Sequence, residues 1–266
     1  MLKYSATQCA AFKTCQRLYA YNYVEGHRPP SSPKQQFGID THTELENWLN
    51  FGTVPSLVAQ QGIKYLPAPL PHLGLDPTVI TADNLFDFHG VQVYSVEHMV
   101  DVDVFGMRAN GKIDILEKTA TDEIVIHDHK TTSNMMYAMD SDRLGKDPAA
   151  LFYALYVLLK FDIERLNLHW IYYCASSPSV GKRKPKGCRE VWALIDSEDP
   201  ETQDLLVDLV SGLASMRTIK ENKVLAQDLP RNLGSCGNYG GCPHRGRCLD
   251  TDSLALLAMN KLKSAK

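Results

Sequence analysis

Two short apolar stretches of the chain carry charged side chains where a buried strand normally carries none. Residues 111–116 and 124–129 have the composition of β-strands and are separated by a polar turn. The first stretch contains Asp114, and the second runs into Asp128 and Lys130. Because side chains alternate along a strand, Asp128 and Lys130 share one face with the isoleucines that precede them. That face begins in the core and ends in a group of charges, which restricts the folds that can hold it.

Carboxylates at the end of a buried strand suit metal-assisted hydrolysis of a phosphodiester. Carboxylate oxygens hold Mg²⁺ or Mn²⁺, and the metal polarises the phosphate and lowers the pKa of a bound water. A neighbouring lysine, here Lys130, can position or deprotonate that water and neutralise charge that builds up on the phosphate. The competing interpretation is an edge strand whose last residues reach solvent, because an isolated Asp-x-Lys triplet is common.

Residues further upstream give this pattern a context. His42 lies in a predicted helix, four residues after Gly38, and Glu97 lies in the first predicted strand. The order of a helix histidine, a strand glutamate, a strand aspartate and an Asp-x-Lys motif resembles the PD-(D/E)XK nuclease superfamily. More narrowly, it resembles the RecB-like branch, in which a G-x-x-x-H motif, an aspartate and a D/E-x-K motif form the metal site. The threonine that follows the lysine in that branch is matched by Thr131.

The resemblance implies a role for each of these residues. The implied metal ligands are His42, Asp114, Asp128 and, through its carbonyl, His129. Lys130 is implied as the catalytic lysine, and Glu97 as an auxiliary acid near the metal. The branch also carries a Q-x-x-x-Y motif on the next helix; here Tyr153 occupies the tyrosine place, as a DNA contact or as ordinary core, but Ala149 stands where the glutamine would be.

Cysteines form a second constellation. Cys236, Cys242 and Cys248 fall within thirteen residues, with glycines that let the backbone curl around a small centre. Cys15, in the first predicted helix, is the leading fourth ligand. Its flanking sequence resembles the N-terminal cysteine segment of iron–sulfur RecB-like nucleases, which include the AddB subunit and the CRISPR-associated exonucleases of spacer acquisition. In those proteins one early and three late cysteines hold a [4Fe–4S] cluster that clasps the two ends of the chain.

Alternatives remain for this second site. Zn²⁺ suits a four-cysteine or Cys₃His site equally well, and Cys9 and His244 compete for the fourth position. The late cysteines are separated by five and five residues, whereas the family usually separates them by two and five. Cys174 and Cys188 read as buried or incidental thiols.

The predicted architecture is an α/β fold, with a restriction-endonuclease-like mixed β-sheet flanked by helices and an iron–sulfur clasp that joins the N- and C-terminal segments. We expect one RecB-like nuclease domain over residues 1–266, in which residues 1–24 plus 230–266 form the cluster-binding appendage. The helices are expected at 5–23, 39–50, 148–161 and 199–220, with a short one at the C-terminus. The strands are expected at 91–104, 111–116, 124–129, 168–174 and 190–195.

The net charge of −3 does not indicate a nucleic-acid binder, because such proteins usually carry an excess of positive charge. Positive charge must therefore be local, and the segment 182–189 carries five cations without an acid. We expect this segment to be a loop that contacts DNA phosphates through Lys182, Arg183, Lys184 and Lys186; a solvated hairpin tip is the alternative.

The leading functional prediction is therefore a Mg²⁺- or Mn²⁺-dependent DNA exonuclease that acts on single strands or ends, in recombination, repair or spacer acquisition. A non-catalytic DNA-binding or assembly subunit and a zinc-stapled structural protein are the alternatives. A helicase or an integrase is the expected kind of partner. The longest apolar run is too short for a membrane span and no signal sequence is visible, so we expect a cytoplasmic protein without membrane contact.

Overall fold

Six strands form one mixed sheet in the computed structural model, which describes residues 2–179, 181–237 and 241–249. The strands are β1 (Lys3–Tyr4), β2 (Val93–Val104), β3 (Met107–Lys118), β4 (Ile124–Thr132), β5 (Arg165–Ala175) and β6 (Pro185–Asp196). Their order is β1-β3-β4-β5-β6, and β2 pairs with the other edge of β3. The β1–β3 and β4–β5 pairs are parallel, and the remaining pairs are antiparallel. The predicted mixed sheet is confirmed.

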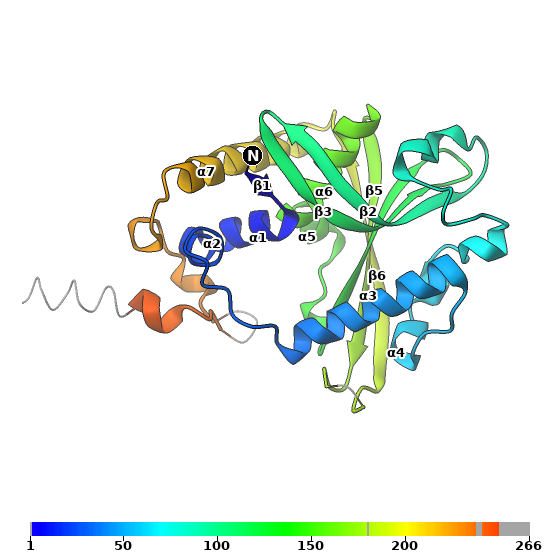
Figure 1. Cartoon of the computed structure of the whole chain (residues 1–266), viewed down its shortest axis with the longest axis horizontal. Coiled ribbons are helices and arrows are strands. Elements are labelled where there is room, and N and C mark those ends of the chain that lie inside the picture. The colour runs from blue at the N-terminus through cyan, green and yellow to red at the C-terminus, as the bar shows by residue number, and fades with distance from the viewer. Residues whose placement is uncertain (1, 180, 238–240, 250–266) are drawn as a thin grey trace, which may run out of the picture.

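Strand β3 changes neighbours along one edge. Its residues 115–118 pair with β4, and its residues 108 and 109 pair with β1. Between these two segments, no described strand pairs with this edge of β3. The two halves of the sheet separate there (Figure 1), and Asp114 lies at the start of the separation.

The helices are α1 (Ala6–Thr14), α2 (Gln16–Tyr23), α3 (Pro33–Phe51), α4 (Leu57–Gln60), α5 (Ser141–Gly145), α6 (Pro148–Phe161) and α7 (Pro200–Glu221). The prediction of one helix from 5 to 23 is wrong, because Cys15 has an extended backbone with φ −166° and separates α1 from α2. Its N–H closes the last turn of α1, and it serves as the N-cap of α2. No breaker residue marks this position.

Helix α3 begins six residues earlier than predicted, and the expected loop over 25–36 is shorter. Ser32 and Gln35 form a capping box, and Pro33 occupies the first helical position, where its missing N–H costs nothing. Helix α6, by contrast, has the predicted bounds, and most of its residues are buried. In the Pro- and Gly-rich segment 52–87 the structure forms α4 and short 3₁₀ turns, 63–65, 70–73 and 82–87.

The basic segment is only partly a loop. Strand β6 begins at Pro185, so Lys186 and Arg189 lie in a strand, while Lys182–Lys184 lie in the connection from β5. The predicted C-terminal helix falls mostly on residues 250–266, outside the described residues; residues 245–249 are helical.

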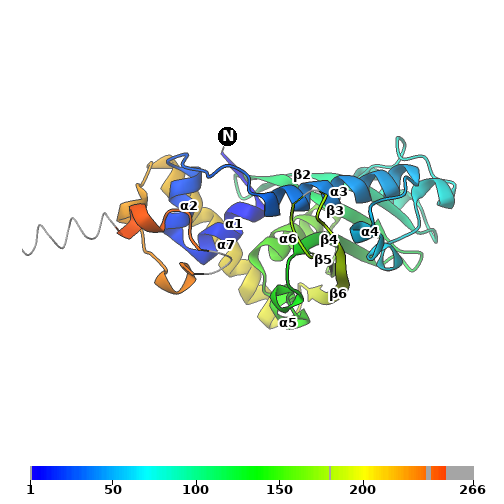
Figure 2. The same ribbon diagram turned by 90° about the horizontal axis from the view of Figure 1, so that it is seen from below.

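Helices cover both faces of the sheet. In β5, Trp170 and Tyr172 join the large apolar cluster that contains α6 and α7, whereas Ile171 and Tyr173 join a smaller cluster with α3 and α4. Alternating residues point to opposite faces, so α3 and α6 lie on opposite sides of β5. Figure 2 shows α3 passing along the sheet.

The N- and C-terminal segments lie side by side at one end of the molecule in both views (Figures 1 and 2). Arg17 of α2 donates from Nε to the carbonyl of Leu229 at 2.8 Å, and Asn232 donates from Nδ2 to the carbonyl of Thr14 at 3.0 Å. Within the described residues, no helix has the length and apolar character needed to cross a bilayer.

Candidate metal centre and active site

The separation of β3 from β4 exposes the carboxylate of Asp114 to a neighbouring main chain. The N–H of His129 donates to Asp114 Oδ2 at 2.7 Å, although the two strands no longer pair as a ladder there. This contact fixes one oxygen of Asp114 and leaves Oδ1 directed toward α3.

His42 approaches this oxygen from α3. Its Nδ1 lies 3.2 Å from Asp114 Oδ1, and its Nε2 lies 2.7 Å from the carbonyl oxygen of His129. A carbonyl only accepts hydrogen bonds, so Nε2 carries a proton. Nδ1 of a neutral ring would then present a lone pair to a carboxylate oxygen, and a cation between the two atoms removes that repulsion. In the metal-free protein a proton fills this role.

The pKa values of this pair reflect the shared proton. Burial lowers the pKa of His42, but the hydrogen bond and the charge of Asp114 outweigh it and raise the pKa to about 9. Burial raises the pKa of Asp114, but the hydrogen bond and the charge of His42 outweigh it and lower the pKa to about 2.

Glu97 reaches the same place from β2. Val96 and His98 pair with Ile115 and Ile113, which places Glu97 opposite Asp114. Its backbone has φ +53°, a left-handed conformation that is uncommon for a non-glycine residue inside a strand. Within the described residues, His42, Glu97 and Asp114 form the one group of three potential ligands whose donor atoms lie within 4.8 Å of one another.

Asp128 and Lys130 form a second part of the site. Their side chains form an ion pair, in which Asp128 is 8% exposed and Lys130 is 42% exposed. Burial and the charge of Asp114 raise the pKa of Asp128 to about 6, although Lys130 opposes this shift. Burial lowers the pKa of Lys130, but the two aspartates outweigh it and raise the pKa. The structure therefore places Asp128 beside Lys130, and not within the three-ligand group.

Helix α3 lies against the end of β4 at Gly38. A Cβ atom at Gly38 would lie 3.4 Å from Thr131 Oγ1, which is close to an ordinary contact distance, so the space between the helix and the strand holds little more than a methyl group. One helical turn later, His42 is at the correct height to reach Asp114. The glycine of the G-x-x-x-H motif and the threonine after the lysine thus contact each other, as Gly38 and Thr131.

Tyr153 lies on α6 beside the open edge of β3. Its ring is 3.6 Å from where a Cβ of Gly111 would stand, and burial, followed by the charge of Asp128, raises its pKa. It is partly buried, so its ring packs against the sheet and also lies near the charges of Asp128 and Lys130.

The donors of the three-ligand group fit a divalent metal. Two carboxylates and an imidazole nitrogen match the oxygen and nitrogen preferences of Mg²⁺ and Mn²⁺, and the opposed Nδ1 and Oδ1 atoms at 3.2 Å call for a shared cation. The carbonyl of His129 is engaged by His42, so its predicted role as a ligand competes with this hydrogen bond.

The family model described as "PD-(D/E)XK nuclease superfamily" matches residues 3–249. The chain belongs to this superfamily. Membership indicates a metal-dependent nuclease, with DNA as the implied substrate, and it agrees with the mixed sheet and its flanking helices.

Other comparisons add little to this assignment. No curated protein matches the chain significantly. Among solved structures, the one titled "Crystal structure of SSO0001" is similar at 13% identity and a TM-score of 0.26, over 68% of this chain and 86% of that one.

This PD-(D/E)XK chain also gathers its predicted cluster cysteines. Cys15, Cys236, Cys242 and Cys248 line one small cavity between α2 and the C-terminal segment. The N–H of Asn232 donates to the sulfur of Cys15 at 3.4 Å. Two segments more than 200 residues apart in sequence therefore meet at these thiols.

Of the two competing ligands, His244 also lines this cavity and Cys9 does not. His244 shares a 2.9 Å hydrogen bond with Asn22 and packs on the ring of Tyr21. Cys9 is buried in the main core, and burial raises the pKa of its thiol to about 12. Cys174 is buried in β5, and Cys188 packs beside the smaller cluster.

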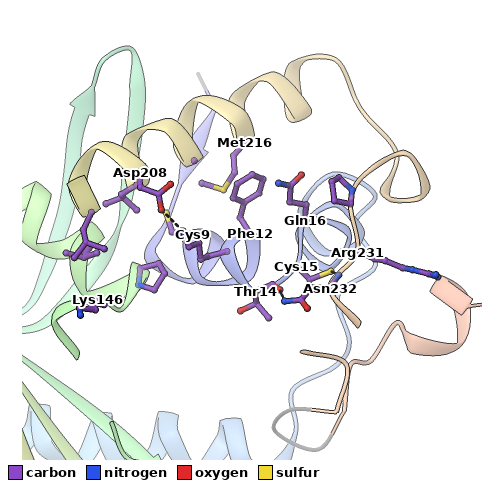
Figure 3. A pocket seen from close by; sticks show the side chains of 17 residues that line it. Cys9, Phe12, Thr14, Cys15, Gln16, Lys146, Asp208, Met216, Arg231 and Asn232 are labelled. Atoms are coloured by element: carbon purple, nitrogen blue, oxygen red, sulfur yellow. Dashed lines mark hydrogen bonds and ion pairs between the residues drawn. The ribbon is translucent and has the colours of Figure 1, made fainter. Parts of the chain in front are cut away.

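A pocket of about 370 Å³ adjoins the cysteine cavity (Figure 3). It lies between α1, α7 and the start of α6, and Cys15 and Arg231 line both spaces. None of the charged residues of the metal centre lines it. It is therefore separate from the chemistry proposed below.

Sequence reasoning missed two features of the charged centre. Lys112 Nζ lies 2.7 Å from Glu97 Oε2 and orients that carboxylate. A buried polar chain also crosses the sheet, in which His127 joins Glu117 at 2.6 Å and His169 at 2.8 Å. Lys112 had a visible signal, since it lies two residues before Asp114; the buried chain had none, because its members come from different strands.

Proposed function

We propose that the protein is a Mg²⁺- or Mn²⁺-dependent DNA exonuclease of the RecB-like iron–sulfur type. The observation that supports it most is the convergence of His42, Glu97 and Asp114 from three separate elements on one point, where the charge of Lys130 acts on both His42 and Asp114. The likeness to the iron–sulfur exonucleases supports DNA ends or single strands as the substrate.

The metal, when bound, would polarise the scissile phosphate and lower the pKa of a water bound beside it. His42, Glu97 and Asp114 would hold it, and Lys112 would keep Glu97 oriented. Lys130 is half exposed and is kept positive by Asp128, so its ammonium can position the attacking water and stabilise charge on the phosphate.

The cysteines support a [4Fe–4S] cluster more than zinc. Sulfurs bound to one zinc ion lie about 3.8 Å apart, as follows from Zn–S bonds of about 2.3 Å in a tetrahedron. No three of the four described thiols have sulfurs within 4.8 Å of one another, and this wider spacing suits a multi-iron cluster better. We propose a structural role for the cluster, in an appendage of one nuclease domain.

The activity test uses end-labelled single- and double-stranded DNA with Mn²⁺. We expect wild-type protein to degrade DNA, and Asp114→Asn and Lys130→Gln to lose about 100-fold or more of that activity. Asp101→Asn, which removes an exposed acid paired with Arg108, is the matched control and should retain activity. Equal activity in all four proteins would point to a contaminating nuclease and contradict the proposal.

A non-catalytic subunit is the alternative outcome of the same test. In that case wild-type protein binds DNA without cutting it, whatever metal is supplied. A helicase partner would supply DNA unwinding, and an integrase partner would supply DNA joining.

A further inference from the structure

Arg183 is the one cation of the predicted DNA-binding set whose side chain is mostly buried, at 14% exposed. Its Nε donates to the carbonyl of Pro178 at 3.0 Å, within the connection between β5 and β6. Its Nη1 lies 2.7 Å from Asp40 Oδ2, and its guanidinium lies 4.8 Å from the ring centroid of Phe37. One side chain thus joins the β5–β6 connection to the first half of α3.

The receiving side of this contact is itself fixed. Gln36 donates from Nε2 to Asp40 Oδ1 at 2.7 Å, so both carboxylate oxygens of Asp40 are engaged. Asp40 stands two residues before His42 on the same helix. Residues two apart on a helix lie about 200° apart around its axis, so Asp40 and His42 point to different sides of α3, and Arg183 contacts the helix that carries His42 without contacting the metal centre.

The lysines beside Arg183 behave differently. Lys182 and Lys184 are exposed, and no ion pair joins either of them to another residue in the described part of the chain. The base of the connection is closed by Ser176, whose hydroxyl donates to the carbonyl of Lys182 at 3.1 Å and accepts from the N–H of Lys184 at 3.1 Å. The two lysines therefore project from a short closed segment that Arg183 holds against α3.

We infer that Arg183 is a positioning residue: it latches the β5–β6 connection onto α3, the helix that carries His42, so that Lys182 and Lys184 are held in place to contact DNA phosphates. The inference rests on the proposed function for its substrate. In this inference Arg183 makes only intramolecular contacts, and the neighbouring lysines bind the phosphates.

The latch and a direct phosphate contact predict opposite effects at Asp40. If Arg183 bound phosphate, Asp40→Asn would remove a competing negative charge and tighten DNA binding. If Arg183 is a latch, Asp40→Asn releases the connection and weakens binding. Arg183→Lys separates them as well, because lysine keeps the charge but loses the stacking on Phe37 and the geometry of the fork.

The experiment compares full-length wild type, Asp40→Asn, Arg183→Lys and the control Asp208→Asn, which breaks a distant exposed ion pair with Lys13. The first readout is the rate of trypsin cleavage after Lys182, followed by mass spectrometry, which reports on local opening without DNA. The second is binding of a fluorescent single-stranded oligonucleotide in EDTA, which prevents cleavage. Thermal melting checks that each variant is folded.

We expect Asp40→Asn and Arg183→Lys to raise the cleavage rate about fivefold and to weaken oligonucleotide binding about threefold or more, with Asp208→Asn unchanged. Unchanged cleavage together with tighter binding by Asp40→Asn would overturn the latch in favour of direct phosphate contact. If cleavage rises but wild type binds no oligonucleotide, the latch stands and its link to DNA is overturned, as is the proposed substrate.

Discussion

His42 is held between an acceptor on each side of its ring. The carbonyl of His129 accepts a hydrogen bond from Nε2, and Asp114 faces Nδ1. The same arrangement that binds a proton in the metal-free protein offers a lone pair to a metal once that proton leaves. A proton and a metal ion therefore compete for one place, and neighbouring acids decide how strongly each is held.

Glu97 has a backbone conformation that a strand residue avoids, and its carboxylate is the third member of the metal group. Glu97→Gln keeps the side-chain shape but removes its charge, so we expect Mn²⁺ affinity to fall about tenfold in isothermal titration calorimetry. Glu123→Gln, in the turn between β3 and β4, is the control. Unchanged affinity for Mn²⁺ would exclude Glu97 as a ligand.

His169 is completely buried and lies between His127 and Glu190. Burial, followed by the charges of His127 and His129, lowers its pKa to about 2. At any pH between this value and the ordinary histidine pKa near 6.5, the unfolded chain therefore binds a proton at His169 that the folded protein does not bind. Stability is fully present above pH 6.5 and falls as the pH is lowered.

From this linkage we expect the free energy of unfolding to drop by up to about 3 kcal/mol between pH 6.5 and pH 4. His169→Gln retains hydrogen-bonding groups but does not titrate, so urea melts of this variant should show a shallower loss. His72→Gln, on the surface, is the control. An unchanged slope in His169→Gln would show that other groups carry the acid sensitivity.

At the scale of elements, the close approach of α3 to β4 decides whether the site is assembled. Gly38→Ala places a Cβ 3.4 Å from Thr131 Oγ1, a distance that ordinary contacts reach, and alanine favours the helix by up to about 1 kcal/mol. We expect this variant to keep its metal affinity and to melt no lower than wild type.

Gly38→Val gives the opposite result. The branched side chain adds two methyl groups at the same contact, so α3 must move away from the end of β4 and take His42 with it. We expect Mn²⁺ affinity to fall severalfold, measured by calorimetry beside Gly38→Ala. Equal affinity in the two variants would show that α3 reaches the metal centre without this contact.

The sequence predicted elements best where local rules decide them. Helix α6 has the predicted bounds because Asp147 caps it and proline starts it. The extended residue Cys15 and the two-residue strand β1 were missed because contacts with distant segments fix them. The separation of β3 from β4 depends on pairing partners, which periodicity does not reveal.

The same limit applies to the site. The spacing of Asp128 and Lys130 predicted their shared face, and their ion pair agrees with it. The relative places of Glu97 and Asp128 could not be predicted, because they depend on a left-handed backbone residue and on where two strands part.

At the scale of the whole molecule, the four cavity-lining cysteines lie where the two ends of the described chain meet. We expect Cys248→Ser to lose the brown colour of an iron–sulfur protein and to lower the melting temperature by about 5 °C or more, because α2 loses its anchor. Cys188→Ser, in β6, should change neither. A colourless wild-type protein that contains one zinc per chain would contradict the cluster.

The hydrogen bonds between Arg17 and residues 227–229 also bear on the order in which parts of the chain fold during synthesis. These two hydrogen bonds join positions 210 and 212 residues apart. Every strand of the sheet leaves the ribosome before residues 227–229 are synthesised. Helix α2 therefore lacks these contacts while the sheet folds beside it. An unfinished chain that lacks residues 226–248 would leave Tyr21 uncovered, because this side chain packs in a small apolar cluster with Ala226 and Cys248.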